Sequence, residues 1–232
     1  MKKLLCLCAL VWVAASVLAL SPEELVRRVN EKYSRVRDAH GEITLDAGLQ
    51  LFGCGGIQRK KGYLWFKAPD KLKAIIGKDT YYVKGNLIRK IDGEGKRFYV
   101  RLLHAPDFSV GFNPGLITSN FNVKQIGETS SEVILEGLPK PGVLKNVKKV
   151  IFRIDQKELL LRGMDLTIKQ GISGKITIKY ENIGGLTVPV STFGKSALEM
   201  NSGILVGLTF NLTGYGLKVN TGLPDRLFEP GF

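Results

Sequence analysis

Cysteine and histidine are scarce in this chain, whose 232 residues include three cysteines and two histidines. Cys6 and Cys8 lie in the first 20 residues, so Cys54 has no partner for a disulfide bond if that segment is removed. Neither His40 nor His104 has a histidine, cysteine or carboxylate at a spacing typical of metal ligands. The sequence therefore predicts neither a disulfide framework nor a metal site.

The sequence motifs of common enzyme classes are also absent. There is no Gly-x-Ser-x-Gly elbow, Walker loop or dinucleotide fingerprint, and no two carboxylates stand out as an acid and base pair. The glycine-rich segment 53–56 joins two expected strands and opens no helix, so it predicts no phosphate site. Asp107 beside His104 is the nearest approach to a catalytic pair, and a loop hydrogen bond explains it more simply. We predict that the protein is not an enzyme and needs no cofactor.

The composition is that of a folded protein with an excess of positive charge. Hydrophobic residues make up 44% of the chain and charged residues 24%, which excludes disorder and a coiled coil. Lysine and arginine number 34 against 21 acidic residues, a net charge of +13. A protein with this excess of positive charge attracts polyanions, whether nucleic acid, an anionic membrane or acidic lipid headgroups.

The N-terminus has the pattern of an export signal. Met1-Lys2-Lys3 is followed by an uncharged apolar run, 4–20, and then by Ser21-Pro22. We predict a signal peptide over residues 1–19, cleaved before Leu20; the alternative is an uncleaved membrane anchor. No cysteine ends the run, so no lipid anchor is expected. Export to the periplasm favours an anionic lipid over nucleic acid as the partner.

A helix is predicted directly after this segment. Ser21-Pro22-Glu23-Glu24 forms a capping box with proline in the first helical turn. An apolar stripe with helical spacing then follows, and His40-Gly41 is expected to end the helix. The stripe consists of Leu25, Val29, Tyr33 and Val36. This amphipathic helix must lie on another apolar surface.

Residues 20–232, which include this helix, are predicted to form a single mainly β domain. From Ile43 to Leu51 apolar and polar residues alternate, as in a half-buried antiparallel strand. Further strands are expected around 63–66, 72–76, 80–83, 87–91, 98–102, 133–138, 147–154, 159–169, 175–180, 186–193 and 204–219. Short turns between several of them favour an antiparallel meander.

Two features suggest a binding surface. The segment 105–122 is apolar but interrupted by prolines, which is typical of a loop covering a pocket or of one that seals a core edge. In Tyr63-Leu64-Trp65-Phe66 both faces of one strand are apolar. One face could line a cavity, or both could belong to a two-layer core, and the periodicity does not separate these interpretations.

The segment Gly62-Tyr63-Leu64-Trp65-Phe66-Lys67-Ala68-Pro69 resembles a motif of the LolA/LolB-like lipoprotein carriers of the bacterial envelope. The order of signal, capped helix, strand, motif and apolar loop is similar, and the segments 182–189 and 223–230 resemble the ending of that family. The resemblance implies a curved antiparallel sheet forming an unclosed half-barrel. It also implies an N-terminal helix and a mid-chain lid over a concave face that holds acyl chains.

The chain departs from that family at one position. An arginine of LolA-type carriers, directly before the proline, ties the lid down, whereas here Ala68 precedes Pro69 and a lysine, Lys67, stands one position earlier. This departure puts the latching of the lid in doubt. The expected absence of a lipid anchor also argues against a LolB-type receptor.

The resemblance and the residues together predict a monomeric periplasmic carrier or chaperone. It would shield the acyl chains of a lipoprotein or envelope lipid for transfer toward the outer membrane, with inner- and outer-membrane transfer proteins as further partners. The alternative is a non-transporting sensor or adaptor that binds a lipid or protein with the same fold. A hydrolase would require His104 and Asp107 to face a buried serine or cysteine.

Three sets of residues are expected to serve this function. Broad apolar walls suffice for an acyl chain, because each buried methylene contributes about 0.8 kcal/mol. The groove is predicted to be walled by Leu49, Leu51, Tyr63, Trp65, Leu72, Ile75, Tyr81, Val83, Phe98 and Val100. The lid residues are Phe108, Phe112, Leu116 and Ile117. Headgroups or the membrane surface would be contacted by Lys60, Lys61, Lys67, Lys71 and Lys73, which could equally be a solvated strand edge.

Overall fold

The computed structural model describes residues 20–51, 54–84, 87–101, 114–144, 146–169, 173–199 and 205–229. The helical elements are α2 (Pro22–Tyr33), α3 (Gly115–Asn120) and the 3-10 helix η2 (Asp225–Phe228). The strands are β1 (Asp38–Leu51), β2 (Cys54–Lys67), β3 (Lys71–Ile76), β4 (Asp79–Lys84), β5 (Leu87–Ile91), β6 (Arg97–Arg101), β7 (Phe121–Glu128), β8 (Glu132–Pro139), β9 (Val147–Asp155), β10 (Leu160–Ile168), β11 (Ser173–Ile183), β12 (Leu186–Glu199) and β13 (Leu205–Val219).

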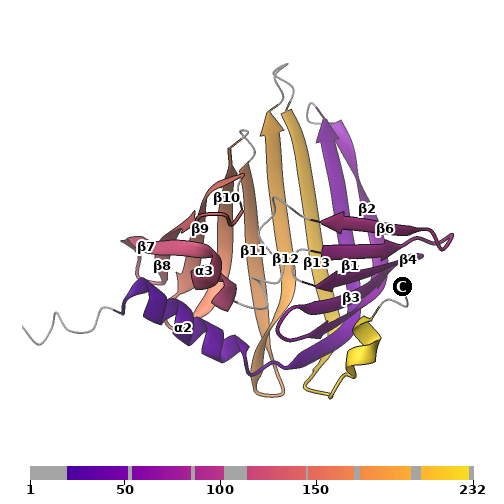
Figure 1. Ribbon diagram of the computed structural model, residues 1–232, viewed down its shortest axis with the longest axis horizontal. Coiled ribbons are helices and arrows are strands. Elements are labelled where there is room, and N and C mark those ends of the chain that lie inside the picture. Colours follow the sequence, from indigo (N-terminus) through magenta and orange to yellow (C-terminus); the bar gives the residue numbers. More distant parts are fainter. Residues whose placement is uncertain are drawn as a thin grey trace, which may run out of the picture.

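All of these strands form one antiparallel sheet that does not close into a barrel. The strand order is β6-β5-β4-β3-β2-β1-β13-β12-β11-β10-β9-β8-β7, so β6 and β7 are the two edges. The long strands β11 to β13, β1 and β2 form the middle of the sheet, and the short strands β3 to β6 cross in front of it at one side (Figure 1). The predicted mainly β half-barrel is therefore confirmed.

The helix α2 begins where the sequence predicts and ends earlier. Ser21 caps it by accepting a hydrogen bond from the Glu24 amide at 3.2 Å. The helix stops at Tyr33, so the expectation that it continues to His40 is wrong. Residues 38–41 pair with β2 instead, and Ala39 and His40 also pair with β13; these ladders satisfy backbone groups that a longer helix would have used.

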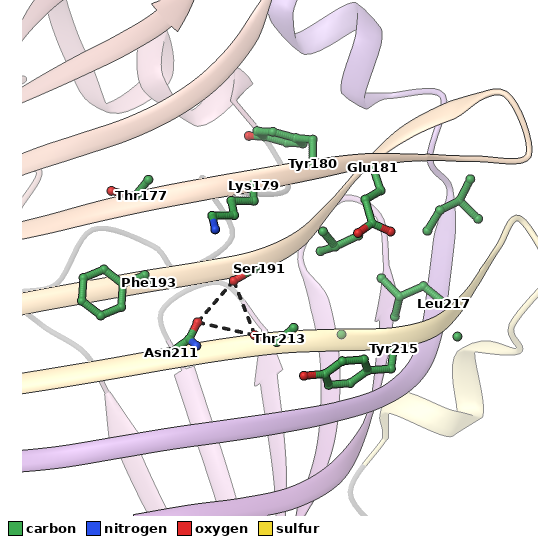
Figure 2. Close-up of a pocket in the computed structure, with 14 residues that line it drawn as sticks. Thr177, Lys179, Tyr180, Glu181, Ser191, Phe193, Asn211, Thr213, Tyr215 and Leu217 are labelled. Atoms are coloured by element: carbon green, nitrogen blue, oxygen red, sulfur yellow. Dashed lines mark hydrogen bonds between the residues drawn. The ribbon is translucent and has the colours of Figure 1, made fainter. Parts of the chain in front are cut away.

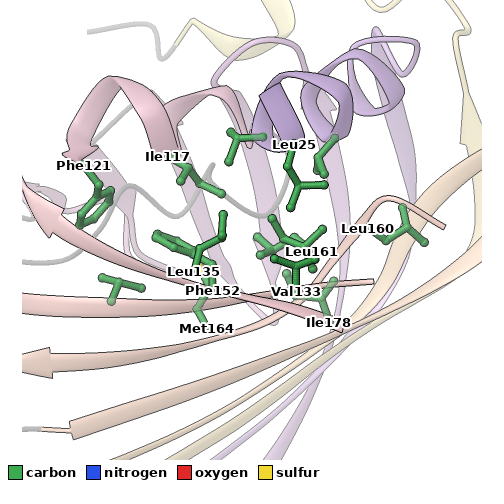
Figure 3. Close-up of a cluster of buried hydrophobic side chains, with 14 of the residues drawn as sticks. Leu25, Ile117, Phe121, Val133, Leu135, Phe152, Leu160, Leu161, Met164 and Ile178 are labelled. Atoms are coloured by element: carbon green, nitrogen blue, oxygen red, sulfur yellow. The ribbon is translucent and has the colours of Figure 1, made fainter. Parts of the chain in front are cut away.

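The main hydrophobic core lies between α2, α3 and the β7 to β11 part of the sheet (Figure 3). Val29 of the helix is fully buried against this core, as are Ile154 and Leu161 of the sheet. Full burial of each such side chain contributes about 1.5–3 kcal/mol. The apolar stripe of α2 thus covers one face of the sheet, as its spacing predicts; Val36 is buried too, beyond the helix end and in a second cluster.

Two smaller clusters continue the core toward β1 to β3. One contains Val36, Ala39, Phe66 and Val188, and the other contains Ile43, Leu64 and Ala74. The predicted alternation holds at Ile43, which is 3% exposed, and fails farther along the strand, where Ala47 is exposed and Gly48 is buried.

The mid-chain region is more regular than the sequence suggests. Residues 105–122 were expected to be loop, but α3 spans 115–120 and β7 begins at Phe121, which is buried against Phe152 in the main core. Strand β7 is not among the strands predicted from the sequence. Within the described ranges, no helix is long and apolar enough to cross a membrane.

Candidate functional site

The strand register divides the side chains of the sheet into two faces. Ile43 on β1 lies beside Gly62 and Gly214, and Leu64 on β2 lies beside Ala74 on β3. Paired residues in an antiparallel ladder point to the same side of a sheet. We call this side, which α2 covers over β7 to β11, the inner face, and the opposite side the outer face.

The inner face remains apolar beyond the part that α2 covers. From the cluster of Ile43, Leu64 and Ala74 it continues through partly buried side chains, namely Leu72, Ile76, Tyr81 and Leu212. Farther out, Phe98 on β6 is 45% exposed and Leu208 on β13 is 53% exposed. Apolar side chains therefore extend along the inner face from the packed core to positions that are half open to solvent, with Lys90 lying between Tyr81 and Phe98.

The ten residues predicted to wall a groove do not share one face. By register, Leu72, Tyr81, Val83 and Phe98 lie on the inner face, as do the backbone positions of Leu49, Leu51 and Val100. Tyr63, Trp65 and Ile75 lie on the outer face, opposite Leu64 and Ala74. A single wall made of all ten is therefore wrong, because adjacent residues of a strand point to opposite sides.

The predicted lid residues fall in two places. Phe108 and Phe112 lie outside the described residues. Ile117 and Leu116 belong to α3, where Ile117 is fully buried in the main core and Leu116 packs against it. The Gly115 amide donates a hydrogen bond to Asn30 Oδ1 at 3.0 Å, which joins α3 to α2.

The five predicted headgroup lysines also separate. Lys60 lies on the inner face and the other four on the outer face. Lys67 and Lys71 both bind Asp225 of η2, with Nζ–Oδ1 distances of 3.1 and 2.8 Å. These two ammonium groups, with Lys71 first, hold the pKa of the Asp225 carboxyl below its ordinary value.

The segment around Ala68-Pro69 packs against the sheet and against the residues after β13. Ala68 packs against the second cluster, beside Phe66. Lys67 donates a hydrogen bond to the Leu223 carbonyl oxygen at 2.7 Å. The lysine that precedes Ala68 therefore fastens the segment after β13 to the sheet.

An ion pair lies on the inner face itself at β4 and β5, where Lys90 is the cross-strand neighbour of both Tyr81 and Phe98. Lys90 Nζ lies 2.8 Å from Asp79 Oδ2 and within 5.8 Å of the ring centroids of both Tyr81 and Phe98. Hydrogen bonding to Lys90 lowers the pKa of Asp79, and the same contact raises the pKa of Lys90. This pair could not be predicted from the sequence, because only the strand pairing brings the two residues together.

The outer face of β11 to β13 carries a hollow of about 730 Å³. At its centre Ser191 donates a hydrogen bond to Asn211 Oδ1 at 3.2 Å, and Thr213 lies 3.5 Å from both (Figure 2). The aromatic rings of Phe193 and Tyr215 lie on either side of this polar group (Figure 2). Sequence reasoning missed this hollow, since its residues come from three separate strands.

The described residues offer little for metal or acid–base chemistry. Among them, no group of three or more histidine, cysteine, aspartate or glutamate side chains could hold a metal ion. His40 Nδ1 lies 2.7 Å from the Tyr63 hydroxyl oxygen, on the outer face. His104 and Asp107, the pair considered for a hydrolase, lie outside the described residues.

Solved structures with a similar fold identify the architecture. A DUF1329 family protein from Desulfovibrio piger aligns with a TM-score of 0.61 and 16% identity, over 89% of this chain and 95% of that one. A LolA superfamily protein from Nitrosomonas europaea aligns with a TM-score of 0.57 and 13% identity, over 91% and 99%. The chain has a LolA-like fold.

A third solved structure, a putative outer membrane lipoprotein-sorting protein domain from Vibrio parahaemolyticus, has a TM-score of 0.62 and 10% identity, over 89% and 95% of the two chains. No protein-family model and no curated protein matches the sequence. At these identities the likeness establishes the LolA-like fold, in agreement with the resemblance of the 62–69 segment, and leaves the ligand to be inferred from the chain's own residues.

Proposed function

We propose that this LolA-like protein is a periplasmic carrier that shields the acyl chains of a lipoprotein or envelope lipid on its inner face, for transfer toward the outer membrane. The observation that supports this proposal most directly is the apolar inner face, which extends past the helix-covered core to the half-exposed Phe98 and Leu208. The described lipoprotein-sorting domain from Vibrio parahaemolyticus shares the fold and adds support.

Acyl chains suit such a surface because their burial requires no directed polar groups. Each methylene removed from water contributes about 0.8 kcal/mol, so contact with ten methylenes contributes about 8 kcal/mol before the costs of association. An inner face lined by leucine, isoleucine and aromatic side chains supplies that contact. Export through residues 1–19 would bring the protein to the compartment where acylated envelope molecules are transferred.

The first experiment is native mass spectrometry of the protein purified without detergent, with lipid extraction of the same sample. Leu208→Glu places a charge on the inner face. Tyr215→Glu is a matched control, since Tyr215 lies on the same strand, on the outer face, with an exposed fraction of 54% against 53% for Leu208. Both substitutions occur at half-open positions, so both variants should keep the fold by circular dichroism.

The proposal predicts bound acylated species in the wild type and in Tyr215→Glu, and at least a tenfold weaker retention in Leu208→Glu, because a buried carboxylate opposes burial of an acyl chain. Equal retention by both variants would place the acyl chain elsewhere. A wild-type protein that stays empty after incubation with envelope lipids would refute the carrier and favour a sensor or adaptor.

A further inference from the structure

Aromatic and cationic side chains alternate in one row across the outer face of β2 to β6. Each member is the direct cross-strand neighbour of the next, so the row runs perpendicular to the strands. Strand by strand, the row consists of Trp65, Lys73, Tyr82, Arg89 and Tyr99. Sequence spacing hides this order, because each member comes from a different strand.

The cations of the row lie over the rings beside them. Lys73 Nζ is 5.4 Å from the ring centroid of Trp65 and 5.4 Å from that of Tyr82. The Arg89 guanidinium carbon is 5.7 Å from the ring centroid of Tyr99. Within about 6 Å such pairs are attractive, so the rings hold the ammonium in place on the surface.

Lys73 differs from the neighbouring lysines in its ionic partner. Lys67 and Lys71 bind Asp225, whereas Lys73 makes no ion pair within the described ranges of the chain. A ring face offers a lysine ammonium no hydrogen-bond acceptor comparable to a carboxylate. The three N–H donors of Lys73 are therefore suited to an anionic ligand.

The outer face of β1 to β6 carries more positive side chains than carboxylates, and Asp225 of η2 binds two of the cations, Lys67 and Lys71. The positive side chains of this face, placed by register, are Arg59, Lys61, Lys67, Lys71, Lys73, Lys84, Arg89 and Arg97. In the described part of these strands the carboxylates on that face are Asp38, Glu42 and Asp46. Asp46 binds Arg59, and Asp38 accepts hydrogen bonds from Thr221 and Gly222.

We propose that the outer face of β2 to β6, centred on Trp65, Lys73 and Tyr82, docks the protein on a membrane surface by binding anionic phospholipid headgroups. Tryptophan and tyrosine favour the headgroup region of a bilayer, and lysine is attracted to its anionic surface. Lys73 and Arg89 are separated by two strand spacings, about 10 Å, so they can reach different headgroups.

This docking deepens the proposed carrier function and rests on it for its biological purpose. It assigns the two faces of the sheet to two lipid moieties, the inner face to acyl chains and the outer face to headgroups. Trp65, which sequence reasoning put in the acyl groove, becomes a membrane-contact residue. The two proposals fail separately, because vesicle docking and acyl retention are measured on different faces.

The test uses the emission of Trp65. Of the chain's two tryptophans, Trp12 lies in the expected signal peptide, so the exported form, 20–232, would keep Trp65 alone. This exported form is mixed with vesicles of equal parts phosphatidylglycerol and phosphatidylcholine, and with vesicles of phosphatidylcholine alone. We expect a blue shift of Trp65 emission with the anionic vesicles only, which is reversed by high salt.

Lys73→Gln should weaken the anionic-vesicle affinity about fivefold, the effect of one lysine near such a surface, while Lys73→Arg should retain it. Lys195→Gln is the matched control. Lys195 Nζ also lies 5.4 Å from an outer-face ring, that of Phe193, but on β12, away from the row. The Lys195→Gln substitution removes the same charge and the same kind of contact at a position outside the proposed docking surface, so this variant should bind vesicles like the wild type.

Three results would overturn the docking surface. These are an equal shift with both kinds of vesicle, an equal loss in Lys73→Gln and Lys195→Gln, and a shift induced by a soluble polyanion such as heparin without any shift on vesicles. The last would assign the face to a polyanionic macromolecule. If vesicles dock while the purified protein holds no acyl species, the carrier proposal fails and the docking stands.

Discussion

A buried carboxylate at the start of β1 holds the end of the chain against the sheet. Asp38 is 4% exposed and accepts hydrogen bonds from the Thr221 amide at 2.7 Å, the Thr221 hydroxyl at 3.0 Å and the Gly222 amide at 3.0 Å. Burial acts to raise its pKa, but the hydrogen bonds from Thr221 and Gly222 act against it and the pKa is lowered overall. The charged form is therefore the one that stabilises the fold.

Asp38→Asn tests this interpretation with almost no change in shape. An amide replaces one acceptor oxygen with an NH₂ group that faces N–H donors, so at least one charge-assisted hydrogen bond is lost and one donor is left unsatisfied. Such a bond contributes about 1.5–3 kcal/mol, and we expect the free energy of unfolding at pH 7 to fall by about 3 kcal/mol. In thermal unfolding this loss corresponds to about 6–12 °C for a chain of this length.

The pH dependence gives an independent check of sign. Because the folded-state pKa is lowered, the stabilisation by Asp38 is present above the unfolded-state pKa, about 3.9, and is lost as the pH falls through the folded-state value. The difference in stability between wild type and Asp38→Asn should be constant from pH 7 to about 5. It should shrink below about pH 4.

Urea unfolding followed by circular dichroism measures this difference, with Asp46→Asn as control. Asp46 lies on the same strand but binds Arg59, whose side chain is 70% exposed, so its loss should cost no more than about 1 kcal/mol. The reasoning would be refuted if the free energies of unfolding of Asp38→Asn and wild type differed by less than about 0.5 kcal/mol at pH 7, the range typical of surface substitutions. A difference that persists undiminished at pH 3 would refute the assigned role of the charge.

Two further substitutions test the packing of the sheet. Gly62→Ala should destabilise the protein by about 1–3 kcal/mol in urea unfolding, because the added Cβ would overlap the backbone carbonyl oxygen of Ile75. Gly56→Ala is the control: Gly56 has open space around it, so this variant should be neutral or slightly stabilising. Equal effects of the two substitutions would contradict the β2–β3 register. Tyr180→Phe should cost about 1–2 kcal/mol in the same assay, because the Tyr180 hydroxyl donates to the Leu161 carbonyl oxygen at 2.6 Å inside the core. Burial raises the pKa of the Tyr180 hydroxyl, so its ultraviolet titration should begin only at a pH well above 10.

The elements that the sequence predicts well are those with a strong local period. The stripe of α2 and the alternation from Ile43 each repeat several times, so each pattern predicts its element; the stripe also predicts the buried side of α2, whereas on β1 Ala47 is exposed and Gly48 is buried. The predicted helix end was wrong because His40-Gly41 is a local stop signal, whereas the real end depends on pairing with distant strands: residues 38–41 pair with β2, and Ala39 and His40 also pair with β13. Strand β7 was missed because it follows a short helix inside an apolar stretch.

The candidate site was less predictable because it depends on pairing between distant residues. In Tyr63 to Phe66 both faces are apolar, and only the register of Leu64 with Ala74 and Gly41 shows which side is buried. Likewise, a sequence can reveal a cluster of lysines but not their partners. Asp225, which binds Lys67 and Lys71, is more than 150 residues away from both.

The two proposed activities can be separated because adjacent residues of a strand point to opposite sides of the sheet. On β2, Leu64 and Trp65 are neighbours in the chain, yet one contributes to the inner face and the other to the outer face. A carrier of this form could load acyl chains on one side of a single-layer sheet while the other side rests on a membrane. Substitutions at Leu208 should then alter retention of the cargo and leave vesicle docking unchanged, and substitutions at Lys73 should do the reverse. If each substitution changed both properties equally, the two faces would not act independently, and a single lipid-binding surface would be the simpler account.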